Sequence, residues 1–84
     1  MKREEIRDRI SNILEELCGT RPTDDEVRLI GDLALDSLRL VTLLVLIEEE
    51  FGIELKECDM NPFSLITVSD VVSMIFKYVG EDDG

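Results

Sequence analysis

Few side chains in this sequence could do chemistry, and Ser37 is the most informative of them. The 84 residues include no histidine, so the commonest general base and the commonest metal ligand are both missing. Ser37 follows Asp36, a favourable N-cap, and no lysine stands nearby in sequence to activate its hydroxyl. A helix N-terminus instead suits a phosphate group, because free N–H groups and the helix dipole favour negative charge. The plain alternative is that Ser37 is only a helix starter.

The two cysteines, Cys18 and Cys58, predict neither a disulfide framework nor a catalytic thiol. They are too far apart in sequence to indicate zinc, and the acidic stretches contain no calcium-loop pattern, so no metal site is expected. Cys18 ends an apolar segment and is expected in the core, whereas Cys58 is expected to be partly exposed. The charged start of the chain is not followed by the apolar region of a signal peptide, and no apolar run approaches the ~20 residues of a membrane span. We therefore expect a cytoplasmic protein with reduced thiols.

Length and charge restrict the function classes further. The chain is long enough for one domain, residues 1–84, and too short for two. Lys and Arg number 9 and Asp and Glu number 20, giving a net charge of −11. That balance argues against nucleic acid and anionic membranes and favours an encounter with a basic protein surface. The acids are concentrated in the second half, and residues 81–84 are expected to form a frayed acidic tail.

Glycine, proline and capping residues divide the chain into helices and loops. Apolar residues at helical spacing predict helices over residues 3–18 and 37–51, each followed by a glycine, and a last helix from Thr67 to the residue before Gly80. Residues 20–35 form a long connection, in which a capping-box pattern over residues 23–26 favours one or two helical turns. A short third helix is expected between Glu57 and Ser64. The predicted fold class is all-α, a small four-helix bundle with a long loop between its first two helices and a short third helix.

Several apolar residues are expected to hold the long connection onto the domain. None of them follows a clean helical period. They are Leu29, Ile30, Leu33 and Leu35.

The helix over residues 37–51 is apolar on two sides. One stripe suits the core and contains Leu40, Leu43, Leu44, Ile47 and Phe51. A second stripe, Leu38, Val41 and Val45, continues onto Glu48 and Glu49, where a surface helix should be polar. Either the helix is central in the bundle, or this stripe is a docking strip that offers a partner apolar contact and electrostatic steering.

The order and spacing of these residues closely resemble the acyl carrier protein family over nearly the whole chain. The resemblance runs through Gly31-Asp32-Leu33-Ala34-Leu35-Asp36-Ser37-Leu38, then Leu40-Val41, Ile47-Glu48-Glu49-Glu50-Phe51-Gly52-Ile53, Leu55 and Thr67-Val68. It implies the carrier-protein four-helix bundle and no catalytic activity. It also implies that a separate phosphopantetheinyl transferase attaches 4′-phosphopantetheine from coenzyme A to Ser37, and that the arm carries an acyl group as a thioester.

The resemblance further implies where partners and cargo lie. A loading enzyme and synthase or transferase enzymes with basic docking patches would bind the chain as a monomer. Their docking residues would be Asp36, Leu38, Arg39, Val41, Val45, Glu48, Glu49 and Leu55. A pocket for a short acyl chain would be lined by core residues such as Leu44, Ile47, Phe51 and Val72.

Some residues depart from the fatty acid carriers. Arg39 and Thr42 stand where those carriers usually place acids, and residues 55–68 form a longer loop. A partner with a purely basic patch would therefore dock less well. We favour a free-standing carrier of fatty acid, polyketide or related biosynthesis with a dedicated pathway. The alternatives are an aminoacyl or peptidyl carrier of a nonribosomal or D-alanyl-transfer pathway and, from another class, an unmodified helical interaction module.

Overall fold

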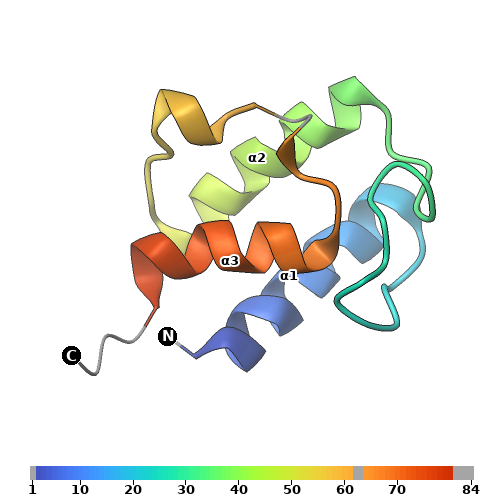
Figure 1. Ribbon diagram of the computed structural model, residues 1–84, viewed down its shortest axis with the longest axis horizontal. Helices are drawn as coiled ribbons and strands as arrows, with labels where there is room; N and C mark the ends of the chain where they lie inside the picture. The colour runs from blue at the N-terminus through green and yellow to red at the C-terminus, as the bar shows by residue number, and fades with distance from the viewer. Residues whose placement is uncertain (1, 62–63, 81–84) are drawn as a thin grey trace.

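Three α-helices and one 3-10 turn make up the regular structure of the computed structural model, which describes residues 2–61 and 64–80. In chain order they are α1 (Arg3–Cys18), α2 (Ser37–Phe51), the 3-10 turn η1 (Glu57–Asp59) and α3 (Val68–Val79). Helix α1 packs against both α2 and α3. The start of α1 and the end of α3 lie on the same side of the molecule, and the long α1–α2 loop lies on the opposite side (Figure 1). The predicted all-α fold class is confirmed.

Local sequence signals set the bounds of the helices. Helix α1 ends at Gly19 and α2 at Gly52, both in the left-handed region, with φ of 76° and 63°. Glycine reaches this conformation without the steric cost that a Cβ imposes. Asp36 caps α2 by accepting a 2.8 Å hydrogen bond from the Arg39 backbone N–H. The predicted bounds of both helices are confirmed.

Helix α3 begins with a complete capping box. The Thr67 hydroxyl accepts from the Asp70 backbone N–H at 3.3 Å, and the Asp70 carboxylate accepts from the Thr67 N–H at 3.1 Å. The cap satisfies two backbone donors that have no partner within the helix. Thr67 also forms an isolated antiparallel bridge with Arg28, which joins the long loop to the start of α3.

The core lies between the three helices and includes part of the loop. Leu29, Leu33 and Leu35 are buried, as predicted, but Ile30 is 51% exposed. Ile30 was expected to hold the loop onto the domain, and that expectation was wrong. The turn over residues 29–33 brings only alternate apolar side chains inward. Cys18 is half-buried against the core, and Cys58 is exposed.

The helical turns predicted over residues 23–26 are also wrong, because the segment forms bends and turns. The Asp24 carboxylate, rather than Thr23, accepts from the Glu26 backbone N–H, at 2.8 Å. A short acidic side chain that bonds two residues ahead stabilises a turn in competition with a helix.

In the described part of the predicted short third helix, Ser64 is in 3-10 conformation and residues 57–59 form the 3-10 turn η1. Its backbone bonds run from Asp59 N–H to Lys56 O at 2.9 Å and from Met60 N–H to Glu57 O at 3.2 Å. These are the tighter bonds of a 3-10 turn. The rest of the predicted segment includes residues 62–63, and the predicted acidic tail is residues 81–84; both lie outside the described residues. None of the described helices combines the length and apolarity needed to cross a membrane.

Candidate functional site

Ser37 is the first residue of α2 and is exposed. The residues before it fix its position. Leu35 is buried in the core, and its N–H donates to Leu29 O at 3.0 Å. Asp36 then caps the helix, so the Ser37 hydroxyl stands at the N-terminus of α2, facing solvent.

The turn that leads into the site closes on itself. The Asp32 carboxylate accepts from the Arg28 N–H at 2.8 Å, and the N–H groups of Asp32 and Leu33 both donate to Arg28 O at 3.0 Å. Ala34 follows with a positive φ of 56°. A residue with a Cβ is strained in this conformation, so the surrounding bonds must hold Ala34 in place.

The surroundings of Ser37 suit a carried group better than a catalytic one. The chain has no histidine to act as a base. Within residues 2–61 and 64–80, no cluster of three potential metal ligands occurs. An exposed hydroxyl at a helix N-terminus, with the Asp36 carboxylate already bonded to Arg39 N–H, fits a phosphodiester. The terminal thiol of 4′-phosphopantetheine would supply a reactive group at this position.

The second apolar stripe of α2 faces solvent. Leu38 is 74% exposed, Val41 44% and Val45 43%. The helix is therefore not enclosed by neighbours on this side, which removes the alternative of a wholly central helix. Arg39 and Glu49 are exposed on the same helix. Exposed apolar residues in a continuous strip indicate a binding surface.

Two of the expected docking residues, Glu48 and Leu55, make contacts within the chain. Leu55, also expected among the docking residues, has a side chain that is only 5% exposed and belongs to the core. Its backbone N–H donates to the Glu48 carboxylate at 2.9 Å. Glu48 is half-buried and ties the end of α2 to the segment that follows. Sequence spacing gave no sign of this contact because it depends on the chain reversal at Gly52.

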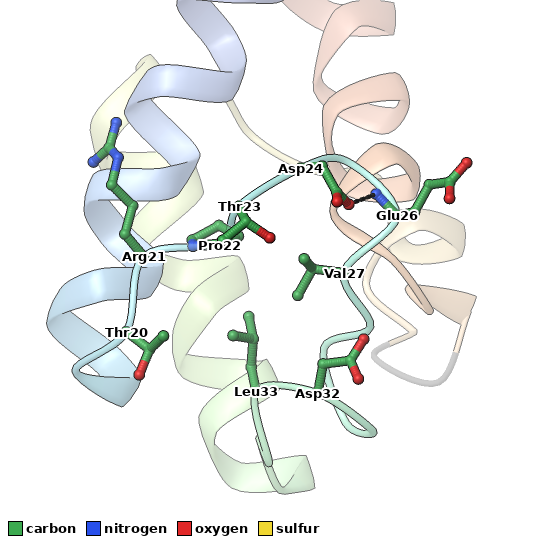
Figure 2. A pocket seen from close by; sticks show the side chains of 9 residues that line it. All are labelled: Thr20, Arg21, Pro22, Thr23, Asp24, Glu26, Val27, Asp32 and Leu33. Carbon is green, nitrogen blue, oxygen red and sulfur yellow. Dashed lines mark hydrogen bonds between the residues drawn. The ribbon is translucent and has the colours of Figure 1, made fainter.

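The residues expected to line an acyl pocket are packed together. Leu44, Ile47 and Val72 are buried, and Phe51 is half-buried. A cargo chain would have to separate these side chains to enter. A cavity of about 450 Å³ lies elsewhere, within the α1–α2 loop, where Val27 and Leu33 line it together with polar residues (Figure 2).

A polar cluster that the sequence did not predict joins η1 to α3. The Tyr78 hydroxyl donates to Asp59 and accepts from the Lys56 backbone N–H at 3.0 Å, while the Lys77 ammonium lies 3.0 Å from Asp59 Oδ1. The hydrogen bond from Tyr78, followed by that from Lys77, lowers the pKa of Asp59 below its usual 3.8. The bond to Asp59 in turn raises the pKa of Tyr78 above its usual 10.0.

Comparison with known proteins identifies this arrangement. The chain matches the phosphopantetheine attachment site family over residues 8–75. It is 40% identical over 80 residues to the acyl carrier protein of Thermotoga maritima, covering 93% of this chain and 96% of that protein. It is 36% identical over 81 residues to the meromycolate extension acyl carrier protein of Mycobacterium tuberculosis (strain ATCC 25618 / H37Rv), covering 94% and 69%. It is also 34% identical over 80 residues to the acyl carrier protein of Rhodococcus erythropolis, covering 93% and 86%.

The chain belongs to the acyl carrier protein family. It is a non-catalytic carrier whose phosphopantetheine arm holds acyl groups. Its partners include a phosphopantetheinyl transferase and the synthase enzymes that the arm serves. The absence of histidine from the sequence agrees with this role, because the chain positions a tethered group and leaves reactions to its partners.

Proposed function

We propose that Ser37 is the residue that carries 4′-phosphopantetheine. The observation that carries this proposal is the position of Ser37 as an exposed first residue of α2 behind the Asp36 cap. In the modification, the serine oxygen forms a bond to phosphorus as the pyrophosphate bond of coenzyme A breaks. The serine proton passes to a base of the transferase, and adenosine 3′,5′-bisphosphate leaves. The N–H groups of the first turn of α2 favour the new negative charge.

Intact mass measurement tests this assignment. The chain is incubated with coenzyme A, magnesium and a broad-specificity phosphopantetheinyl transferase. We expect one phosphopantetheine increment on the wild type, none on Ser37→Ala, and a full increment on the matched control Ser69→Ala, which changes a serine near the start of α3. An increment on Ser37→Ala, or none on folded wild type, would contradict the proposal.

We further propose that the exposed residues of α2 dock the loading enzyme and the synthase. They are Leu38, Arg39, Val41, Val45 and Glu49, together with the N-cap Asp36 and the half-buried Glu48. Leu38→Ser should lower kcat/KM for acyl loading about tenfold, as expected for an anchor in an interface. Ile66→Ser is the matched control because Ile66 is 60% exposed but lies outside α2. Equal losses for the two variants would place the docking surface elsewhere.

For the pathway, we propose acyl cargo of the fatty acid type. The support comes from the relatives, which are named as acyl carriers and include meromycolate extension carriers. The phosphopantetheine-bearing chain should accept a malonyl group from malonyl-coenzyme A with a malonyl transferase, and no amino acid from an adenylating enzyme of a nonribosomal pathway. The reverse result would favour an aminoacyl carrier. We also propose that the protein is cytoplasmic, which its two unpaired cysteines support. We propose that it is a monomer, and light scattering should then give a mass of 9.6 kDa.

A further inference from the structure

Along the outward face of α2, the exposed side chains change from apolar to acidic. Residues Leu38, Thr42, Val45 and Glu49 follow one another at steps of four, three and four, so they form one line along the helix. The Thr42 hydroxyl donates to Leu38 O at 3.0 Å and is satisfied within the helix. The line is therefore apolar from its start to Val45 and acidic at its end.

Arg39 stands beside the start of this line, and the acid nearest to it in sequence, Asp36, accepts from its backbone N–H rather than from its guanidinium. Other arginines are engaged: Arg9 lies 3.2 Å from Glu50, and Arg21 donates to Asn12 at 2.6 Å. Among the described residues, the Arg39 guanidinium forms no ion pair, and the positions three and four residues further along α2 hold Thr42 and Leu43.

Helix geometry also separates Arg39 from the modified serine. Two residues correspond to about 200° around the helix axis, so Ser37 and Arg39 stand at opposite edges of the exposed face. Arg39 is thus poorly placed to neutralise a phosphodiester on Ser37, and its charge is available to another molecule.

The acids at the other end of α2 are fewer than the sequence indicates. Glu48 accepts from the Leu55 N–H at 2.9 Å, and Glu50 pairs with Arg9. Glu49 is exposed, and the structure shows no such contact for it within the described residues. The face therefore presents a cation, an apolar strip and an anion in that order.

We infer that the acyl-transferring enzyme that docks on α2 has a docking patch of mixed sign. It places an acidic side chain against Arg39, an apolar pocket over Leu38 and Val45, and a basic side chain against Glu49. This inference rests on the proposed function, because it names the partner of the same surface. A partner with basic residues throughout would meet Arg39 with like charge, which slows association and weakens docking.

The test uses an enzyme with the opposite preference. The probe is a malonyl transferase of bacterial fatty acid synthesis whose docking patch contains only basic residues. The phosphopantetheine-bearing wild type, Arg39→Glu and Lys2→Glu are compared by the rate of malonyl loading at low salt. Lys2→Glu makes the same change in net charge just before α1, away from α2. We expect Arg39→Glu to raise kcat/KM about tenfold and Lys2→Glu less than about twofold, with both effects reduced at high salt.

A second arm tests the acidic partner directly. In a variant of the transferase, the patch residue that faces the start of α2 is changed from Lys to Glu. This enzyme should load the wild type faster than Arg39→Glu, reversing the order. The melting temperature of Arg39→Glu checks that this variant folds. It should not fall below that of the wild type, because a glutamate near a helix N-terminus is favourable.

The outcomes separate the two proposals. No phosphopantetheine on Ser37 contradicts the proposed function and this inference together. Normal modification followed by equal rates for wild type and Arg39→Glu, or by no reversal with the altered enzyme, contradicts the inference alone.

Discussion

Three positions in the left-handed region allow the backbone strain beside Ser37 to be measured. Gly19, Gly52 and Ala34 have φ of 76°, 63° and 56°. A Cβ added at Gly19 or Gly52 would meet no atom within 4 Å, so a change there reports backbone conformation without a packing effect. Ala34 is exposed, so removing its methyl group leaves no cavity.

The expected magnitudes follow from two opposing contributions. A Cβ in the left-handed region costs about 1–2 kcal/mol. Glycine loses about 0.5–1 kcal/mol more conformational entropy on folding. Ala34→Gly should therefore stabilise the fold by about 0.5–1 kcal/mol, and Gly19→Ala and Gly52→Ala should each destabilise it by a similar amount. For a domain of this size, that corresponds to shifts of about 2–8 °C in Tm.

Thermal melting and urea unfolding of the three variants provide the assay. The sign of the change in stability is decisive, because each of the three variants adds or removes one methyl group at a position in the left-handed region. Destabilisation by Ala34→Gly would refute the reasoning, and so would Gly19→Ala or Gly52→Ala variants as stable as the wild type. The phosphopantetheine increment on Ala34→Gly should be unchanged if the strain is only a cost of the loop and has no role in presenting Ser37.

Other perturbations test the internal contacts. Asp59 has a depressed pKa in the folded state, so its stabilisation is present above pH 3.8 and is lost as the pH falls through the folded value. Tyr78→Phe removes the hydrogen bond that is the main cause of the lowered pKa of Asp59. The difference in Tm between the variant and the wild type should therefore shrink as the pH falls. A difference in Tm that does not change with pH would contradict this. Glu48→Ala should cost about 1 kcal/mol in urea unfolding because it leaves the Leu55 N–H unpaired, whereas Glu49→Ala should cost almost nothing. Added salt should raise Tm by screening the net charge of −11, and a curve insensitive to salt would argue against that repulsion.

Sequence reasoning succeeded where the determinant is local. The bounds of α1 and α2 follow from apolar spacing and from terminal residues such as Asp36 and Gly52, all within one helix. The start of α3 follows from the capping box between Thr67 and Asp70. The second apolar stripe on α2 was also visible in the sequence, but the choice between a central helix and an exposed strip needed the structure.

The failures involve contacts that close only in the folded chain. Leu55 was expected at the surface, but the reversal after Gly52 turns its side chain into the core. The hydrogen bond from Leu55 N–H to the Glu48 carboxylate was not predicted, because it spans seven residues and falls outside helical spacing. Asp59 and Tyr78 are nineteen residues apart. No periodicity within one segment could have paired them.

The position of Ser37 depends on the start of α3 as well as on the loop itself. Asp70 caps the N–H groups before α3, Ile66 O accepts from Leu29 N–H at 2.9 Å, and Leu29 O accepts from Leu35 N–H at 3.0 Å, two residues before Ser37. A further bond from Val68 N–H to Val27 O, at 3.1 Å, strengthens the junction. A long loop without helix or strand would normally leave such a residue poorly positioned. Here backbone bonds between the loop and the residues at the start of α3 hold the loop in place, so Ser37 has a defined position and remains exposed, as the proposed modification requires.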